Sequence, residues 1–409
     1  MVKKVILLMA AMAFLAFSCT VTEVVVPNVT TLDAISLNPN TASTRAVIKD
    51  RDSLQNDPVG FVVYADTATT FTTTVWFIEG ENHAYGTANG WSFTPAIAWP
   101  SKYPLAFLAF YPEAGAGHVI TSVTDVLTPT STSVELTIEI PTAKDGQEDV
   151  IVARDTAKTG KPSGGELPLN FKHILSKVNF TVSTDDPTDK AYVLAVGFCN
   201  LVSTATFEAT DDSWTLGTYG TDIDTFNYYN AFEPIAGGFR PEIEFMNANK
   251  DSLFTGAAAK TEHLMLLPQD PDVWDISDPI LHPTNLEAHI RLLYRLEVTG
   301  NPDRVGYADA QDHDDWSVFG ASYTGPLYVM VGYAYDATWE SGKGYSYDIP
   351  IPGTGGGIYL DEFYYDNEGN RTDLRIPGAV LYGHVLGDNI SLPADVEDWI
   401  DEPSSDVFD

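Results

Sequence analysis

The sequence predicts an all-β protein made of two β-sandwich domains. Aromatic residues make up 12% of the chain, Thr and Val are abundant, and 31 Gly and 25 Pro offer many places for turns. Long stretches with helical periodicity are scarce, and the spacing of strand-like runs is close to that of β-sandwiches. With 409 residues the chain exceeds the size of a single core, so we expect two domains.

The first eighteen residues have the order of an export signal. Lys3 and Lys4 precede an apolar run, 5–17, which is too short to span a bilayer because a spanning helix needs about 20 residues. The sequence LAFSC that ends at Cys19 resembles a lipobox, in which a peptidase cuts before a lipidated Cys. We therefore expect a lipoprotein signal peptide at 1–18 and acyl chains such as palmitate on Cys19. An ordinary signal peptidase site is the alternative.

The segment 19–45 differs in composition from the rest of the chain. It starts with several Val residues and continues as a tract rich in Thr, Ser and Asn. Arg45 is the only basic residue between Cys19 and Lys49, so a trypsin-like protease would find one isolated target there. A plain linker charge is the other interpretation of Arg45.

Strand-like apolar runs occur along the whole chain. The first group comprises Gly60–Tyr64, Thr72–Ile78, Leu105–Tyr111, Ser133–Ile140, Asp149–Ala153, Leu167–Phe171, Lys177–Val182 and Ala191–Phe198. The second group comprises Glu242–Phe245, His263–Leu267, Ala288–Val298, Pro326–Tyr335, Tyr345–Ile351 and Val380–Val385. The turn sequence Asp185-Asp186-Pro187 predicts a boundary between an N-terminal sandwich, 46–186, and a C-terminal sandwich, 187–409, which ends in an acidic tail.

The charge of the chain is strongly acidic. Asp and Glu number 57 against 22 Lys and Arg, which gives a formal net charge of -35. Such a charge repels phosphate groups, whereas a nucleic-acid binder needs a basic face, so nucleic acid is excluded as a partner. With Cys19 assigned to the lipid, Cys199 has no disulfide partner in the chain. Since Cys199 lies in an apolar run, we expect a small buried side chain and not a reactive thiol.

Sequence motifs of common enzymes are absent. There is no G-x-S-x-G, H-E-x-x-H, G-x-x-x-x-G-K-[ST] or C-x-x-C pattern. The densest ligand-like cluster, Asp312-His313-Asp314-Asp315, lacks EF-hand spacing and is interpreted as an acidic surface loop, with a calcium site as the alternative. Gly353–Gly357 is followed by no Lys and no helix pattern, so we expect a hairpin or interdomain loop. The sequence therefore predicts no enzymatic activity, no cofactor and no metal.

Several segments, taken in order, resemble the fimbrillin family, which comprises pilin subunits and related surface lipoproteins of type V pili. The most specific match is Glu148–Ala153, a variable loop and then Leu167–Val182, in the order D-x-x-x-A, loop, F-x-H-x-L-x-K-V. Shorter matches are Phe107–Pro112, His263–Gln269 and Trp339 with Gly342–Tyr347. Within the main match, we expect His173 to be a buried, hydrogen-bonded structural residue.

The resemblance implies sandwiches of transthyretin-like, Greek-key topology and a mode of assembly. In the family a lipidated precursor reaches the cell outer membrane, and an Arg-specific protease removes the leader. The lost first strand leaves a groove that a donor strand of another pilus subunit fills. In this chain the lost strand would be 21–26 or a segment up to Arg45, and the cut would fall between Arg45 and Ala46.

The C-terminal stretch allows two interpretations. Val380–Leu386 is either a last domain strand or a donor strand for a neighbouring subunit. The acidic residues that follow, from Asp388 to Glu402, would be costly to bury in a groove. This cost favours a tip or accessory subunit over a shaft subunit.

The functional hypothesis is a structural and adhesive pilus subunit, located at the outer membrane as a precursor and in the extracellular pilus afterwards. Its expected partners are other pilus subunits, the outer membrane through Cys19, an Arg-specific protease and a host or bacterial surface ligand. The first alternative is a monomeric surface lipoprotein that binds glycans through some of its 8 Trp and 20 Tyr. Trp76 and Trp316 lie beside apolar strand residues, so core packing also explains these aromatics. An exported hydrolase is the remaining alternative.

Overall fold

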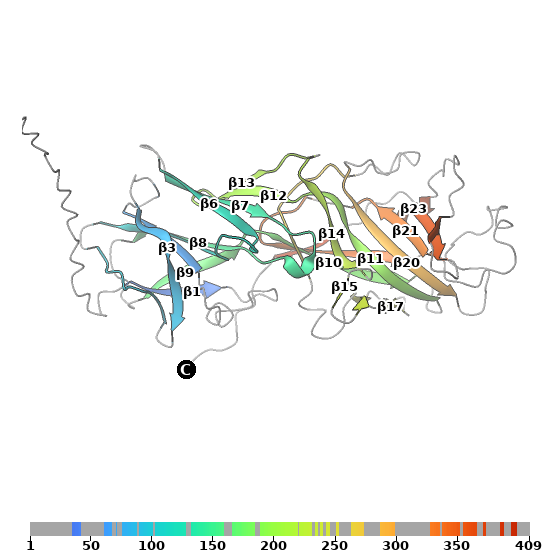
Figure 1. Ribbon diagram of the computed structural model, residues 1–409, viewed down its shortest axis with the longest axis horizontal. Coiled ribbons are helices and arrows are strands. Elements are labelled where there is room, and N and C mark those ends of the chain that lie inside the picture. Colours follow the sequence, from blue (N-terminus) through green and yellow to red (C-terminus); the bar gives the residue numbers. More distant parts are fainter. Residues whose placement is uncertain are drawn as a thin grey trace, which may run out of the picture.

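The computed structural model describes the strands of an all-β protein and the loops that join many of them. The described residues are 35–41, 61–67, 71, 76–87, 90–100, 103–127, 132–158, 166–184, 189–219, 221–230, 234–235, 238–239, 243–245, 251–252, 263–273, 287–298, 328–335, 338–351, 355–365, 371–373, 385–387 and 394–398. They form an elongated arrangement of sheets (Figure 1). The one helical turn among them is the 3-10 helix η1, Lys144–Gly146. The predicted all-β fold class is confirmed.

A closed barrel forms one end of the described structure (Figure 1). Its strands follow the order β1-β4-β3-β2-β5-β8-β9, and β9 pairs back to β1. Their bounds are β1 Ser36–Thr41, β2 Phe61–Asp66, β3 Trp76–Thr87, β4 Gly90–Phe93, β5 Leu105–Tyr111, β8 Ile151–Lys158 and β9 Glu166–His173. All its ladders are antiparallel except the one between β1 and β9, which is parallel.

A four-stranded sheet has the strand order β13-β12-β7-β6. In the sequence, β6 and β7 lie between the barrel strands β5 and β8. Its strands are β6 Ile120–Leu127, β7 Thr132–Glu139, β12 Thr204–Glu208 and β13 Ser213–Leu216. Alternate residues of β7, Val134, Leu136 and Ile138, are fully buried, as expected for a sheet with one covered face.

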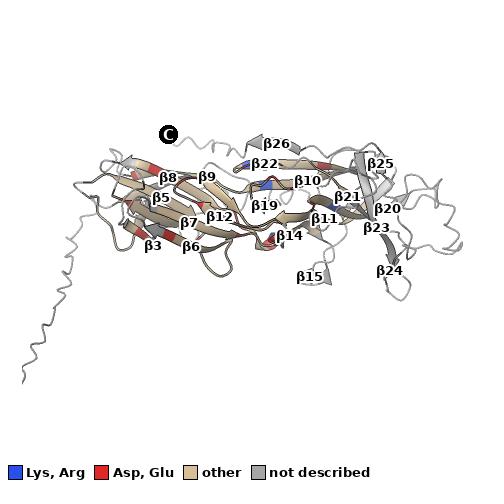
Figure 2. Cartoon of the chain, turned by 90° about the horizontal axis from the view of Figure 1, so that it is seen from above, with Lys and Arg blue, Asp and Glu red and all other residues tan. Residues whose placement is uncertain are grey.

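Two larger sheets form the other end of the described structure. The first has the order β18-β10-β22-β26 with β19 beside β10, and comprises β10 Ser176–Thr184, β18 Asp251–Ser252, β19 Leu264–Leu266, β22 Lys343–Ile351 and β26 Ala394–Asp398. The second has the order β14-β11-β20-β21-β23-β24, and comprises β11 Asp189–Val202, β14 Ile223–Asn230, β17 Ile243–Phe245, β20 His289–Val298, β21 Tyr328–Tyr333, β23 Gly355–Tyr365, β24 Arg371–Asp373 and β25 Val385–Gly387. A separate small ladder joins β15 Pro234–Ile235 to β16 Gly238–Phe239. The two larger sheets lie in separate layers in Figure 2.

An aromatic core fills the space between these two layers. The ring of Phe180 in β10 lies 4.9 Å from that of Phe198 in β11, measured between centroids. Tyr347 of β22 lies 5.5 Å from Phe198 in an edge-to-face arrangement, and its hydroxyl accepts a 2.9 Å hydrogen bond from Nε1 of Trp339. The family match at Trp339 and Gly342–Tyr347 therefore lies partly within this core.

Three barrel strands are buried on both faces. In β2, Phe61, Val63 and Ala65 point into the barrel core, whereas Val62 and Tyr64 belong to a second core outside the barrel. The strands β5 and β8 divide their residues between the two cores in the same alternating way. Burial on both faces explains why these strands appear in the sequence as unbroken apolar runs and not as alternating patterns.

Most predicted strands are confirmed, with ends shifted by a few residues. Some strands are absent from the prediction because they are short or have polar residues on one face; these are β1, β4, β6, β12, β13 and β14. The prediction of a glycine-rich loop at Gly353–Gly357 is wrong for its second half, because Gly355 and Gly357 start β23 and pair with β25. Likewise, the predicted acidic tail contains a strand, β26, which pairs with β22.

Four ladders join strands from opposite sides of the predicted domain boundary at residue 186. The strand β7 pairs with β12, and β10 pairs with β18, β19 and β22. The side chain of Gln147 adds a link, since its Nε2 donates to the carbonyl of Pro141 at 2.9 Å and its Oε1 accepts from the Met265 amide at 2.8 Å. The boundary at 186 and the Greek-key connectivity stay predictions.

In the part of the chain that the structure describes, no helix has the length and apolar character needed to cross a membrane.

A second buried glutamine supports the end of β11, and we expect it to matter for stability. Gln269 Oε1 accepts from the Val202 amide at 3.0 Å, and its Nε2 donates to the Val202 carbonyl at 3.3 Å. The substitution Gln269→Leu leaves both backbone groups unpaired in a buried place, so it should lower the free energy of unfolding by about 2 kcal/mol. Urea denaturation measures this loss, and a change within about 0.5 kcal/mol, typical of surface substitutions, would show that these bonds contribute little.

Candidate functional site

The first strand, β1, closes the barrel. It runs antiparallel to β4 through the pairs Ser36 with Ser92 and Leu37 with Trp91, and parallel to β9 along all six of its residues. Among the described residues β1 is the sole connection between β4 and β9. Without β1 the barrel would be an open sheet with two unpaired edges.

Two side chains of the β1 region are buried in the barrel core. Ile35 is 1% exposed and Leu37 is 0% exposed, and both belong to the core cluster that contains Trp91. Ser36, between them, is half-buried, and its hydroxyl donates to the carbonyl of Trp91 at 3.3 Å. The alternation of two buried aliphatic residues around a Ser is the pattern of a strand with one face on the core.

The end of β9 is held by a buried contact between His173 and Asp149. Nδ1 of His173 lies 2.7 Å from Oδ2 of Asp149, and these side chains are 7% and 0% exposed. The prediction of a buried structural histidine at position 173 is thus confirmed. Both partners belong to the main family match, so the pairing gives the spacing of that motif a physical reason.

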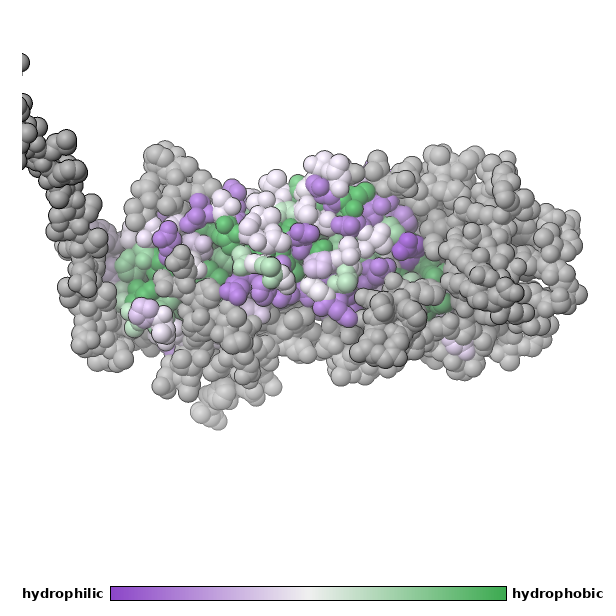
Figure 3. Space-filling model, in the orientation of Figure 1, coloured by the Kyte–Doolittle hydropathy of each residue, from purple (hydrophilic) through white to green (hydrophobic). Residues whose placement is uncertain are grey.

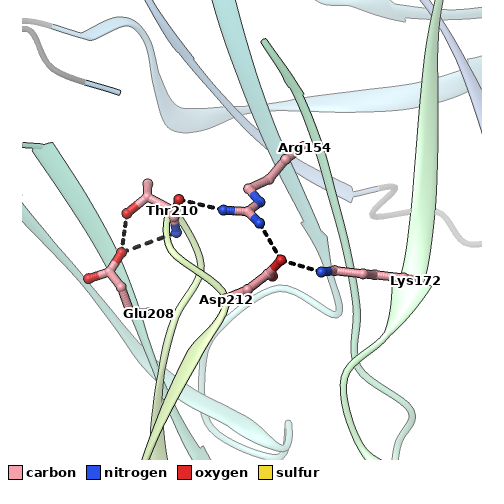
Figure 4. Close-up of polar contacts among 5 residues, drawn as sticks. All are labelled: Arg154, Lys172, Glu208, Thr210 and Asp212. Atoms are coloured by element: carbon pink, nitrogen blue, oxygen red, sulfur yellow. Dashed lines mark hydrogen bonds and ion pairs between the residues drawn. The ribbon is translucent and has the colours of Figure 1, made fainter. Parts of the chain in front are cut away.

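A charged network on the outside of the barrel ties β8 and β9 to the turn between β12 and β13 (Figure 4). Asp212 accepts from Arg154 of β8 and from Lys172 of β9. Arg154 also donates to the carbonyl of Thr210 at 2.5 Å, and Glu208 accepts from the amide and hydroxyl of Thr210. The turn therefore accepts hydrogen bonds from the two neighbouring barrel strands β8 and β9, and β9 is also the strand that pairs with β1.

Cys199 is buried and free, as predicted, but its surroundings are more polar than the sequence suggested. It pairs across the ladder with His289, whose Nδ1 lies 3.0 Å from the carbonyl oxygen of Glu287. Burial opposes the thiolate, but hydrogen bonding and charge from His289, helped by Arg291, lower the pKa of Cys199 below its ordinary value. Burial likewise opposes the imidazolium, yet the hydrogen bond with Cys199 leaves the pKa of His289 raised.

Several residues singled out in the sequence lie outside the described residues. These are the lipidation site Cys19, the processing residues Arg45 and Ala46, the cluster Asp312–Asp315, and Trp316. The described part of the chain holds no group of three or more His, Cys, Asp or Glu side chains arranged to bind a metal. Trp76 is 8% exposed and packs against Tyr64 at 5.0 Å between ring centroids, so it serves the core.

Comparisons with known proteins identify the family. A family model described as fimbrillin-like matches residues 44–358, more than half of the chain. The chain belongs to the fimbrillin-like family. This confirms the resemblance found in the sequence, and it supports a fimbrial or adhesive role at the cell surface, in assembly with other pilus subunits.

Solved structures are similar to this fimbrillin-like chain at low sequence identity. A fimbrial protein from Bacteroides vulgatus aligns with 89% of this chain and 99% of its own, at 14% identity and a TM-score of 0.55, which shows a shared fold. A candidate cell adhesion protein from Bacteroides uniformis covers 90% of this chain and 99% of its own, at 14% identity and a TM-score of 0.40. The curated proteins include no match.

The buried pair at the end of β9 should be important for stability. Removing either partner leaves the other polar side chain without this contact in the interior, so Asp149→Ala and His173→Ala should each cost about 3 kcal/mol of unfolding free energy. The double variant should cost much less than the sum. The half-exposed pair His118 and Glu148, 3.2 Å apart, is the matched control, and His118→Ala should cost at most about 1 kcal/mol. Equal losses at the two pairs would contradict this assignment.

The charged network should show a smaller, salt-dependent effect because its side chains are 25% to 53% exposed. Asp212→Asn should cost about 1 kcal/mol at low ionic strength and less in about 0.5 M NaCl, where exposed charges are screened. Asp211→Asn, one residue away, is the control and should change the unfolding midpoint little. A loss at Asp212 that is the same at both salt concentrations would argue against an electrostatic role.

Proposed function

We propose that this fimbrillin-like chain is a non-enzymatic structural and adhesive subunit of a type V pilus. It is exported as a lipoprotein precursor, held at the outer membrane by lipid on Cys19, cut between Arg45 and Ala46, and assembled by donor-strand exchange. The single observation that carries the proposal is the position of β1. This strand closes the barrel, and in the sequence it lies between Cys19 and Arg45.

Cleavage at Arg45 would remove the covalent connection between β1 and the rest of the barrel. The strand would then be held by its ladders and by buried side chains such as Ile35 and Leu37. Each of these two contributes about 1.5–3 kcal/mol by burial. Such binding is strong enough to keep the precursor folded and weak enough to be replaced by an incoming strand with a similar pattern.

The loss of β1 would leave most of the core in place. Ile35 and Leu37 belong to the barrel core, whereas the larger core that joins the barrel exterior to the other sheets contains neither of them. The opened barrel would offer the free edges of β4 and β9. A donor strand can pair with both edges, gaining backbone hydrogen bonds while its alternate side chains refill the core.

The place of β26 supports a tip or accessory position for the subunit. The acidic strand Ala394–Asp398 pairs with β22 inside the chain's own sheet. A shaft subunit must give a strand to its neighbour and also accept one. A chain whose last described strand completes its own sheet is better suited to accept a strand than to give one.

Treatment of the purified precursor with an Arg-specific protease tests the proposal. We expect a new N-terminus at Ala46 in the mass spectrum, release of the 19–45 fragment, and association of the cut protein with other pilus subunits. The variant Arg45→Lys keeps the charge but removes the protease target, so it should stay intact and monomeric. An uncut Arg45, or a cut protein that never associates, would overturn the proposed assembly.

A reversible lock on β1 separates cleavage from strand exchange. Ser36 and Ser92 lie opposite each other in the antiparallel ladder between β1 and β4, where Cβ atoms are about 4.5–5.5 Å apart. The double variant Ser36→Cys and Ser92→Cys should be cut normally when oxidised but keep β1 and fail to assemble. Reduction of the disulfide should restore assembly; assembly of the oxidised protein would show that β1 is not the strand that leaves.

A further inference from the structure

The chain between β4 and β5 forms a hook beside the start of β1. We use this name for residues Thr94–Trp99. After β4 ends at Phe93, Thr94, Pro95 and Ala96 are exposed, and the chain then returns to the barrel at Ile97. The ring of Trp99 is 5.7 Å from that of Phe107 in β5, in an edge-to-face arrangement. The hook is therefore anchored on a strand that is independent of β1.

One hydrogen bond joins the hook to the residue before β1. The amide of Ile35 donates to the carbonyl of Ile97 at 2.7 Å. The ladder between β1 and β4 begins only at Ser36. One residue earlier, at Ile35, the hook and not β4 provides the backbone hydrogen bond. Ile97 and Trp99 also pack against the barrel core in which Ile35 is buried.

We propose that the hook extends the slot of β1 by one residue, demands a backbone donor at the Ile35 position and thereby helps to select the donor strand; this proposal rests on the proposed exchange of β1. The occupant is an extended segment of another pilus subunit. It carries an aliphatic residue with a free amide at the Ile35 position, a small polar residue next, and a second aliphatic residue at the Leu37 position.

Alternation of side chains alone does not fix this register. A slip by one residue turns apolar side chains out of the core and is excluded by burial. A slip by two residues keeps every side chain on the same face. The Ile97 carbonyl accepts from whichever residue occupies the Ile35 position. It therefore excludes a register that places a proline there, and the fit of the side chains to the core separates the remaining registers.

The position of the one proline in β1 agrees with a hook that demands a backbone donor. Pro39 lies within β1 opposite Leu169 of β9, two residues beyond Leu37, the last residue of the described ladder with β4. A proline lacks the amide hydrogen and is found in strands where one side is unpaired. At the Ile35 position a proline would remove the donor to Ile97, so donor strands with proline there should be rejected.

Hydrogen exchange on the uncut precursor tests the hook directly. We expect the Ile35 amide to be as protected as that of Leu37. The variant Trp99→Ala removes the anchor on Phe107 and should speed exchange at Ile35 about tenfold with little change at Leu37. Phe77→Ala, another half-buried aromatic on the same core, is the matched control and should not single out Ile35. An unprotected Ile35 amide, or equal loss at Ile35 and Leu37 in Trp99→Ala, would overturn the proposal.

A peptide measurement covers the case in which Trp99→Ala fails to fold. A synthetic peptide of residues 33–43 competes for the place of β1 in the cut protein, and its analogue carries an ester in place of the Ile35 amide. The ester keeps the side chain but lacks the donor, so it should bind roughly tenfold more weakly, the effect of about one hydrogen bond. Equal binding would overturn the proposal. Hydrogen exchange is measured on the uncut chain, so its result does not depend on cleavage. A failure of cleavage at Arg45 would therefore refute the proposed function without deciding whether the hook binds the Ile35 amide.

Discussion

The architecture of this fimbrillin-like chain depends on barrel strands that are buried on both faces. In β2, β5 and β8, alternate side chains fill the barrel core and a larger external core. A strand with two buried faces has little freedom to slip, because a shift of one residue would exchange the residues of both cores at once. These strands therefore form a fixed layer, and the other sheets are arranged around it.

The layers are joined by buried polar groups as well as by apolar packing. Gln147 donates to the carbonyl of Pro141, just after β7, and accepts from Met265 in β19. Gln269 likewise offers a donor and an acceptor to the end of β11. Each side-chain amide acts here as a substitute for a peptide group at a place where the ladders end. The buried pair of Asp149 and His173 joins the start of the β8 segment to the end of β9. Such groups specify one arrangement because any other arrangement would leave them unpaired in the interior.

The sequence contained enough information for the fold class and for part of the core, but not for contacts that depend on topology. Unbroken apolar runs indicated strands such as β5, and the family motif indicated a structural role for His173. The partner of His173, by contrast, is 24 residues earlier in the chain, and pairing them requires the register of β8 and β9. The link from Asp212 to Arg154 and Lys172 and the pairing of Cys199 with His289 likewise join distant segments. The strand β1 was missed as an element because Asn38, Pro39 and Asn40 give it little strand propensity.

This weak propensity agrees with the proposed replacement of β1 by a donor strand. The sequence of β1 has a proline and two asparagines, and its ladder with β4 is two residues long. The strand β1 therefore depends on a slot formed by other segments. One wall of this slot is β9, which Lys172 and His173 tie to neighbouring segments. The other wall is β4 together with the hook. The walls of this slot are stabilised by contacts that do not involve β1. A preformed slot lowers the cost of ordering for whichever strand occupies it, so the same contacts that fold the precursor would also receive a partner. The barrel supplies the order that the sequence of β1 lacks. Under the proposed exchange, a replacement strand would displace β1 by matching the slot better.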